Sequence, residues 1–236
     1  QNQENLHVRL NTTLTGVNGF VGNFESTLSA NGTEETLEYG VAVLATGAAP
    51  YQPTEYSYGK DPRILTSLEL DRKFIENDSA LDKIDTAVFI QCVGSREPER
   101  PYCSRVCCTH SVENALELKK RNPKMSVFIL YRDMRTYGER EYLYKEARQA
   151  GVIFIRYTLN RKPKIKVQKR KIKIEVIDHV LGQPVVIAAD RVTLASAILP
   201  AGVCSSNDRT RPIAWIDARG FQPRRTIVVA RLHQPL

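Results

Sequence analysis

Apolar residues in the middle of the chain follow two alternating patterns, one typical of strands and one typical of helices. Short apolar runs predict buried strands over 85–91, 126–131 and 152–157. Between them, apolar positions spaced three and four apart predict helices over 104–121 and 139–150. Strands that alternate with helices in this order form a βαβαβ unit, and right-handed crossovers make its sheet parallel. The pattern therefore predicts an α/β fold with a Rossmann-like domain.

Shorter strand patterns flank this unit on both sides. Residues 6–14, 20–30 and 36–44 precede the unit and have the residue pattern of short strands. A hairpin-like stretch over 164–187 follows the unit, and residues 191–197 are a predicted closing strand. We therefore expect a β-rich segment before the unit and a strand that returns to its sheet afterwards.

Four of the five cysteines are grouped at one place in this pattern. Cys92 comes at the carboxyl end of the unit's first strand, where open α/β sheets bind their ligands. Cys103, Cys107 and Cys108 come at the start of the next helix, whose N-terminus favours thiolate over thiol. Because Cys103 and Cys107 are four residues apart, we expect them to share one helix face. Four thiolates match the ligand set of an iron–sulfur cluster or a structural zinc ion.

The same cysteines are also compatible with simpler roles. They can be buried apolar side chains, because free cysteine is readily buried. A disulfide framework is less consistent with a chain of this length that shows no signal peptide. Structural zinc sites usually use paired C-x2-C knuckles, and the spacing C-x10-C-x3-C-C lacks that arrangement. The sequence therefore favours an iron–sulfur cluster and leaves zinc and buried thiols open.

The composition is that of a soluble globular protein with an excess of basic residues. The 236 residues are 42% hydrophobic and 25% charged, with a formal net charge of +8. No apolar run is long enough to cross a membrane, so we expect a cytoplasmic chain that reaches a membrane only through partners. Lysine and arginine are concentrated over 161–173, where alternation with isoleucine and valine is typical of solvated strands. Aromatic stacking residues are absent there, which disfavours nucleic acid and leaves an acidic protein partner open.

The turn after the unit's first strand differs from that of a nucleotide-binding domain. A G-x-G-x-x-G turn lets a pyrophosphate approach the N-terminus of the following helix. Here the turn reads Cys92-Val93-Gly94-Ser95-Arg96, so a nucleotide phosphate has no ready-made cradle. The cysteines occupy the corresponding place, which predicts the exchange of electrons rather than hydride.

The order of the elements resembles that of two-dinucleotide flavoprotein reductases. In that superfamily, a strand ending in Ala-Thr-Gly approaches the flavin nucleotide, and its small residues permit close backbone contact. Here the strand pattern over 36–44 leads into Ala45-Thr46-Gly47. The tripeptide alone is equally typical of an ordinary turn at a strand end, and no N-terminal FAD fingerprint is present.

Five separate segments carry a closer resemblance. They are residues 19–24, 65–69, 88–96, 101–108 and 131–138. Together they resemble the A-type subunit of heterodisulfide reductase, including the quinone-linked relatives of that subunit, and the resemblance covers most of residues 1–200.

This resemblance implies a thioredoxin-reductase-like fold with two dinucleotide-binding domains, a bound FAD and a [4Fe–4S] cluster. The implied cluster ligands are Cys92, Cys103, Cys107 and Cys108, and the implied flavin contacts are Ala45, Thr46, Gly47 and Glu69. Glu69 is implied as a near-flavin carboxylate. It is equally well interpreted as a charge at the start of a helix after Thr66 or Ser67.

The resemblance also implies a division of the chain and a function. Residues 1–80 would be a partial FAD-binding domain, residues 81–200 a Rossmann-like domain with the cysteine site, and residues 201–236 a divergent tail, for which a remnant of the FAD domain is one interpretation. Because the sequence begins at Gln1 and lacks an FAD fingerprint, we expect a fragment. The implied function is electron transfer between FAD and the cluster in an oxidoreductase complex. Its other subunits would be iron–sulfur proteins linked to hydrogenase or quinone.

Two other functions remain as alternatives. A structural or assembly module would keep the fold and a metal site but bind no flavin. A pyridine-nucleotide-dependent disulfide reductase is disfavoured, because no C-x-x-C pair is present to act as its redox dithiol.

Two departures from the family pattern change specific expectations. Many members have a lysine five positions after the last cysteine, where Glu113 stands here. A carboxylate would disfavour an anionic reduced flavin, which favours simple electron transfer over bifurcation, unless Glu113 is only a solvated helix residue. The basic tail over 203–236 lacks a recognisable flavin-binding return segment, so it is either a docking arm or a disrupted ending. Cys204, in this tail, is expected to be a spare thiol.

Overall fold

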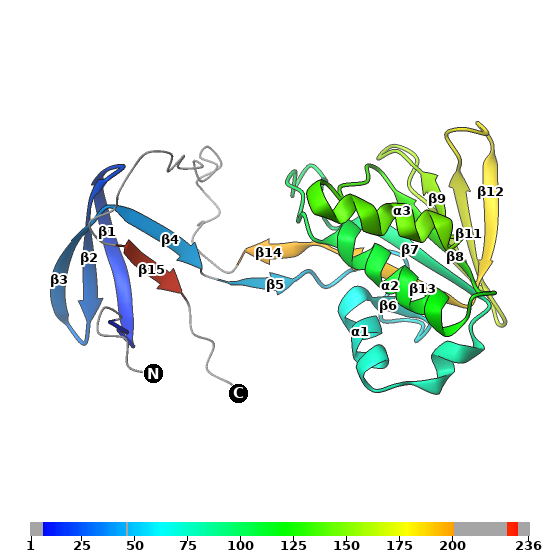
Figure 1. Cartoon of the computed structure of the whole chain (residues 1–236), viewed down its shortest axis with the longest axis horizontal. Coiled ribbons are helices and arrows are strands. Elements are labelled where there is room, and N and C mark those ends of the chain that lie inside the picture. Colours follow the sequence, from blue (N-terminus) through cyan, green and yellow to red (C-terminus); the bar gives the residue numbers. More distant parts are fainter. Residues whose placement is uncertain (1–6, 46, 201–225, 231–236) are drawn as a thin grey trace. The chain divides into compact units, whose positions relative to one another are not determined.

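The computed structural model describes residues 7–45, 47–200 and 226–230 of the chain. The chain forms two compact units, one of residues 1–48 with 200–236 and one of residues 49–199 (Figure 1). Among the described residues, no helix combines the length and the apolar character needed to span a membrane. The four cysteines that the sequence groups together all belong to the larger unit.

A parallel sheet of five strands forms the centre of the larger unit. Its strands are β6 (Ile64–Thr66), β7 (Thr86–Val93), β8 (Ser126–Tyr131), β9 (Ile153–Arg156) and β13 (Arg191–Ser196). Their order is β6-β13-β7-β8-β9, and every pairing is parallel. The carboxyl ends of the strands therefore lie along one edge of the sheet. The predicted α/β class and the Rossmann-like parallel sheet are confirmed.

Helices cover one face of this sheet (Figure 1). They are α1 (Ser67–Ile75), α2 (Cys107–Arg121) and α3 (Glu141–Gln149), with short 3-10 turns η1 (Ser79–Lys83) and η2 (Gly138–Arg140). Side chains of β7 alternate, so Ala87 and Phe89 pack with Val112 and Ala115 of α2 in one buried cluster. Burying a side chain as large as Phe89 contributes about 1.5–3 kcal/mol to folding. This packing fixes α2 against the strand that carries Cys92.

A second sheet covers the opposite face. It consists of the antiparallel strands β10 (Lys164–Val167), β11 (Ile172–Ile177) and β12 (Pro184–Ala189). Ile172 and Ile174 of β11 pack with Val88 and Ile90 of β7, whereas Lys173 between them is exposed. The alternation of basic and apolar residues therefore reflects a sheet with one buried face. The expected hairpin over 164–187 is wrong in its strand count, because a second turn at 178–183 makes three strands.

The start of α2 differs from the prediction in a way that affects the site. The helix begins at Cys107, not at 104, because Arg105 has a φ of +65°, a left-handed conformation that a right-handed helix cannot contain. Cys103 therefore lies in the loop before α2. The expectation that Cys103 and Cys107 share one helix face is wrong.

The smaller unit contains an antiparallel sheet of three strands. They are β1 (Thr12–Phe20), β2 (Asn23–Ala30) and β3 (Thr33–Tyr39). Asn31 and Gly32, with φ of +50° and +81°, form the two-residue turn between β2 and β3. The predicted strands over 6–14 and 20–30 are shifted, because the first turn falls at Val21-Gly22 and leaves Phe20 as the last residue of β1.

Two further strand pairs complete the described part of the chain. β4 (Val41–Ala45) pairs in parallel with β15 (Thr226–Ala230), and β5 (Ala48–Pro50) pairs with β14 (Ile198–Pro200). Residues 49–80, which the sequence assigns to the flavin part, group with the larger unit. The functional division into 1–80, 81–200 and 201–236 stays a prediction.

Candidate metal centre

Cys92 lies near the end of β7, at the start of a loop with an unusual backbone. Cys92 is 8% exposed and has a φ of +60°, and Arg96 has a φ of +57°. Such conformations cost non-glycine residues about 1–3 kcal/mol each and are concentrated at functional sites. Gly94, with a φ of +74°, is required between them, because a Cβ at this position would collide with the ring of Tyr51. The surrounding structure therefore holds the loop after Cys92 in a strained form.

Cys107 and Cys108 bring the first turn of α2 to the carboxyl edge of the sheet. The Cys107 thiol donates to the carbonyl oxygen of Ser196, the last residue of β13, over 3.6 Å. The Cys108 thiol donates to the carbonyl oxygen of Asp133, just after β8, over 3.6 Å. Cys92 comes from β7, which lies between these two strands. The three thiols therefore lie where open α/β sheets bind their ligands.

Cys103 comes from the loop that precedes α2. Its sulfur accepts a hydrogen bond from the backbone N–H of Arg105 over 3.4 Å. The next residue, Ser104, accepts a hydrogen bond from the backbone N–H of Ile198 over 2.9 Å. This bond fixes the loop beside the segment that follows β13.

The thiols of Cys107 and Cys108 lie within electrostatic range of each other and of the remaining two. Burial raises the pKa of Cys107 to about 12, and Cys108, Cys92 and Cys103 add to the rise. Burial likewise raises the pKa of Cys108 to about 11, again with contributions from Cys92 and Cys103. The N-terminus of α2 alone would lower these pKa values, so burial outweighs it. Without metal, both thiols are therefore protonated at neutral pH, and metal binding must release their protons.

Two arginines hold the loop after Cys92. The Nη1 atom of Arg96 lies 4.0 Å from the sulfur of Cys92, and its Nη2 atom forms an ion pair of 2.5 Å with Asp133. Arg132 is buried and donates to the carbonyl oxygens of Ser95 and Arg96 over 2.6 and 2.8 Å. Positive charge is therefore fixed beside a thiol that a metal would convert to thiolate.

Buried polar groups without partners also occur on the elements that carry the cysteines. Gln91, next to Cys92, is fully buried, and neither atom of its amide group has a hydrogen-bond partner in the described structure. The buried hydroxyls of Thr109 and Ser111 on α2 also lack hydrogen-bond partners in the described structure. An unmade hydrogen bond of this kind costs about 1–3 kcal/mol. The four thiols match the donor set of an iron–sulfur cluster, and the unpaired groups lie on the same elements as three of these thiols.

The four thiols are not arranged as the ligands of a metal ion in this structure. In the described ranges, no group of three or more histidine, cysteine, aspartate or glutamate side chains is placed to hold a metal ion. The assignment of Cys92, Cys103, Cys107 and Cys108 as ligands therefore stays a proposal, supported by their common location and their electrostatic coupling.

The tripeptide expected to contact a flavin lies in the smaller unit, at the end of β4. Ala45 is the last residue of this strand and pairs with Ala230 of β15. Gly47 has a φ of +80°, which suits a glycine in a tight turn. Thr46 lies outside the described residues. Flavin contact by these residues stays a prediction.

Glu69 has a clear local role in the structure. Its carboxylate accepts hydrogen bonds from the backbone N–H of Thr66 over 2.7 Å and from the Thr66 hydroxyl over 2.9 Å. The Glu69 backbone N–H donates to the Thr66 hydroxyl oxygen, which completes a capping box at the start of α1. Tyr58 donates to the same carboxylate over 3.0 Å. The helix-start role of Glu69 is thus observed, and its role near a flavin stays a prediction.

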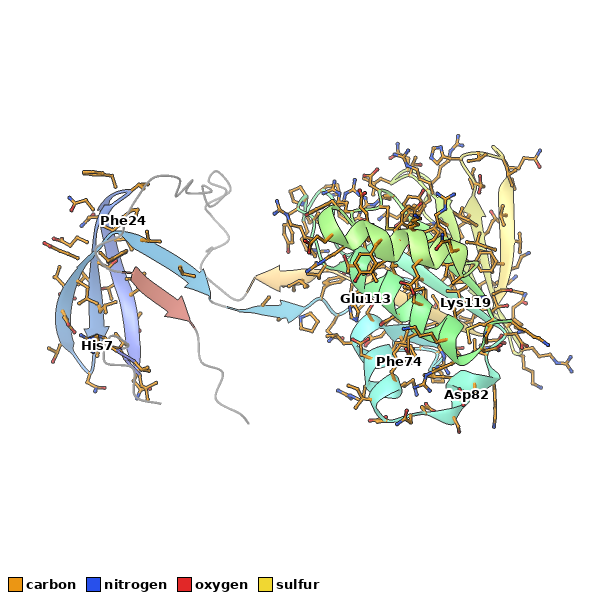
Figure 2. The ribbon with its side chains drawn as sticks, viewed as in Figure 1. His7, Phe24, Phe74, Asp82, Glu113 and Lys119 are labelled. Atoms are coloured by element: carbon orange, nitrogen blue, oxygen red, sulfur yellow. The ribbon has the colours of Figure 1, made fainter. Side chains whose placement is uncertain are left out.

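Glu113 and Cys204 are two other residues for which the sequence suggests a role. Glu113 is exposed on α2 (Figure 2), as expected of a solvated helix residue. Cys204 lies outside the described residues, together with most of the basic tail.

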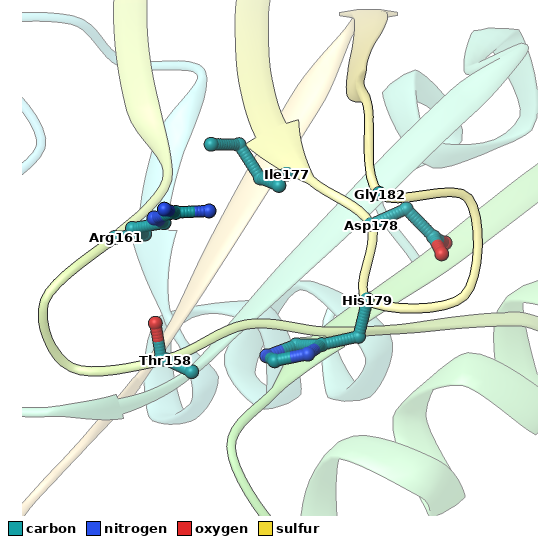
Figure 3. Close-up of a pocket in the computed structure, with 6 residues that line it drawn as sticks. All are labelled: Thr158, Arg161, Ile177, Asp178, His179 and Gly182. Atoms are coloured by element: carbon teal, nitrogen blue, oxygen red, sulfur yellow. The ribbon is translucent and has the colours of Figure 1, made fainter.

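A separate cavity of about 180 Å³ lies between the segment after β9 and the turn that joins β11 to β12. Thr158, Arg161, Ile177, Asp178, His179 and Gly182 line it (Figure 3). The Asp178 carboxylate is turned toward its own loop, where it accepts from the backbone N–H groups of Val180 and Leu181. No cysteine contributes to this cavity, so it is not part of the candidate metal centre.

Sequence reasoning missed the residues that surround the thiols. Arg96 and Asp133 lie 37 positions apart, and their ion pair depends on the parallel pairing of β7 with β8. A signal was present, because both residues follow predicted strands of one parallel sheet and therefore lie at the same edge.

The chain is similar to subunits of heterodisulfide reductases. It is 37% identical over 139 residues to the A-type subunit of the H(2):CoB-CoM heterodisulfide,ferredoxin reductase of Methanothermobacter thermautotrophicus, a match that covers 52% of this chain and 21% of the relative. It is 33% identical over 186 residues to the iron-sulfur A-type subunit of the CoB–CoM heterodisulfide reductase of Methanocaldococcus jannaschii, with 71% of this chain and 28% of the relative covered. The matched segments therefore span only about a fifth to a quarter of the length of these relatives.

The similarity of the chain to solved structures is weaker. Among solved structures, the chain is similar to a NAD-dependent persulfide reductase from A. fulgidus, at 23% identity and a TM-score of 0.40, covering 80% of this chain and 31% of that protein. No protein-family profile matches the chain.

Proposed function

Because the chain belongs to the family of A-type subunits of heterodisulfide reductase, we propose that it is part of an iron–sulfur flavoprotein that passes electrons between FAD and a [4Fe–4S] cluster. The activity is that of an electron-transfer subunit in a heterodisulfide-reductase-like oxidoreductase. One observation carries the proposal: Cys92, Cys107 and Cys108 lie at the carboxyl edge of a parallel sheet, and Cys103, in the loop before α2, is electrostatically coupled to two of them.

In this proposal, Cys92, Cys103, Cys107 and Cys108 hold the cluster. When bound, the cluster supplies one-electron transfer, whereas a flavin exchanges two electrons. The chain itself provides the environment: Cys92 and Cys108 are buried, which excludes water from two of the four sulfurs. Burial and fixed positive charge are both factors that set the potential of such a cluster.

The flavin contacts in the proposal are Ala45, Thr46, Gly47 and Glu69. Support comes from the end of β4, where small residues follow a strand that pairs in parallel with β15. Close backbone approach to a nucleotide requires small residues such as these. Glu69 takes part only if its carboxylate can serve a flavin while it caps α1.

The number of cysteines limits this sequence to one such cluster. With four cysteines assigned to one cluster, only Cys204 remains in the sequence, which is too few for a second cluster. Electrons that reach this cluster must therefore continue through groups held outside this sequence. We propose iron–sulfur subunits linked to hydrogenase or quinone as the partners.

The ligand set is tested by serine substitution in protein purified without oxygen. Cys107→Ser should lose iron or change the electron paramagnetic resonance spectrum of the reduced protein, because serine is a poor cluster ligand. Cys204→Ser is the matched control and should leave both unchanged. Equal iron content and identical spectra for Cys107→Ser and the unaltered protein would refute the proposed ligands.

Flavin absorbance in the same preparations tests the other half of the proposal. Bound FAD together with iron supports the iron–sulfur flavoprotein. A preparation with iron and no flavin would instead support the structural or assembly module.

A further inference from the structure

Arg96 connects all three segments that supply the cysteines. Its Nη1 atom lies 4.0 Å from the sulfur of Cys92. Its backbone N–H donates over 3.0 Å to the carbonyl oxygen of Tyr102, the residue before Cys103. Its Nη2 atom pairs over 2.5 Å with Asp133, whose carbonyl oxygen accepts from Cys108. No sequence motif or comparison assigns a role to this residue.

The backbone conformation of Arg96, its contact with Arg132 and its burial all restrict where its side chain can lie. Its φ of +57° is a left-handed conformation that a non-glycine residue adopts only when its surroundings require it. Arg132, buried at the end of β8, donates over 2.8 Å to the Arg96 carbonyl oxygen. The Arg96 side chain is only 21% exposed. Its guanidinium is therefore held beside Cys92 and is not a mobile surface charge.

We propose that Arg96 is a positioning residue of the cluster site, which orients the Cys92 sulfur and keeps a positive charge beside the cluster. The inference rests on the proposed function. Its guanidinium has five N–H donors in a planar fork, so it can serve Asp133 and the Cys92 sulfur at the same time.

The charge of Arg96 has a predictable effect on reduction. A cluster with four thiolate ligands is anionic, and each electron that it accepts adds negative charge. A fixed positive charge and a hydrogen bond to a ligand sulfur both stabilise the reduced form. Arg96 therefore raises the midpoint potential of the cluster, and its removal makes the cluster harder to reduce.

The test compares four forms of the whole chain, purified without oxygen: the unaltered protein, Arg96→Gln, Arg96→Lys and Arg156→Gln. Iron and sulfide are quantified, and the midpoint potential is measured by a redox titration followed by electron paramagnetic resonance. Arg156 is the matched control, because it also pairs with Asp133, over 3.1 Å, but has no cysteine among its described contacts.

We expect a more negative midpoint potential for Arg96→Gln, an intermediate value for Arg96→Lys, and a value close to that of the unaltered protein for Arg156→Gln. Lysine keeps the charge but lacks the planar fork, so it restores only part of the effect. Loss of iron from the Arg96 variants also supports the proposal when the circular dichroism of the metal-free protein is unchanged.

Other outcomes distinguish a failure of the proposed function from a failure of the role of Arg96. Unaltered protein without iron would refute the proposed function itself. A normal cluster in the unaltered protein with an unchanged potential and spectrum in Arg96→Gln would overturn the role of Arg96 alone. A shift of equal size in Arg156→Gln, or loss of the fold in both Arg96 variants, would also overturn it.

Discussion

Arg132 donates a hydrogen bond of 2.6 Å to the carbonyl oxygen of Ser95, which ties the end of β8 to the loop after β7. Arg132 is 7% exposed, and its second donated bond, to the carbonyl oxygen of Arg96, has a length of 2.8 Å. A buried arginine therefore satisfies two carbonyl groups of the loop that presents Cys92. The geometry of the candidate site depends on a residue that contacts no cysteine in the described structure.

Arg132→Ala should destabilise the chain by about 3 kcal/mol, because it leaves two carbonyl groups with low solvent access unpaired. The measurement is the free energy of unfolding in urea. The control is Arg170→Ala, at an exposed position in the turn between β10 and β11, which should change stability by less than about 0.5 kcal/mol. Equal stability of the two variants would show that Arg132 does not hold the loop.

Gly94→Ala should be more damaging than Gly182→Ala. Both glycines have positive φ, +74° and +64°, so both substitutions introduce about 1 kcal/mol of backbone strain. At Gly94 the new Cβ would also collide with the ring of Tyr51, whereas at Gly182 it would meet nothing within 4 Å. The difference in thermal midpoint between the variants measures that collision. Matching midpoints would contradict the described packing of the loop on Tyr51.

Substitutions at the capping box separate the two roles considered for Glu69. Thr66→Ala and Glu69→Ala should each lower the free energy of unfolding by about 1 kcal/mol, because each removes a partner from the start of α1. If Glu69 also contacts a flavin, only Glu69→Ala should shift the flavin absorption spectrum. A spectrum that shifts in neither variant, or equally in both, would leave Glu69 as a helix cap and remove it from the flavin site.

Asp190 should make stability fall in acid. Burial alone would raise its pKa, but hydrogen bonds from Lys171 and from the backbone N–H groups of Thr86 and Asp85 lower it below its ordinary value of 3.8. A carboxyl group with a lowered folded-state pKa stabilises the fold above its unfolded-state pKa, and this contribution is lost as the pH falls through the folded-state pKa.

Asp190→Asn should therefore cost about 1 kcal/mol at pH 7 and progressively less below about pH 4. Urea unfolding of both forms from pH 7 to pH 3 measures this difference. A constant difference across that range would mean that the charge of Asp190 contributes nothing.

The central elements could be predicted from the sequence because their apolar patterns are long. β8 coincides with the predicted range 126–131, and β7, β9 and α3 overlap their predicted ranges. β6 has only three residues, too few to show a period, so the strand that begins the sheet could not be recognised. The start of α2 was placed too early because the left-handed conformation of Arg105 depends on its tertiary surroundings.

The sequence predicts that the cysteines group together in the fold but not the charges around them, and the role of the cysteines as ligands stays a prediction. Strand ends and helix starts predict Cys92, Cys107 and Cys108 at one edge of the sheet, whereas Cys103, expected on the helix, lies in the loop before it. The raised pKa values of Cys107 and Cys108 depend on burial, and the Arg96–Asp133 pair depends on which strands are neighbours. Neither property can be read from local sequence.

The most direct test of the proposed cluster is the quantification of iron and acid-labile sulfide in anaerobically purified protein, with electron paramagnetic resonance before and after reduction. We expect about four irons and four sulfides per chain and a signal that appears on reduction. Zinc in place of iron, or no metal in protein protected from oxygen throughout, would refute the cluster.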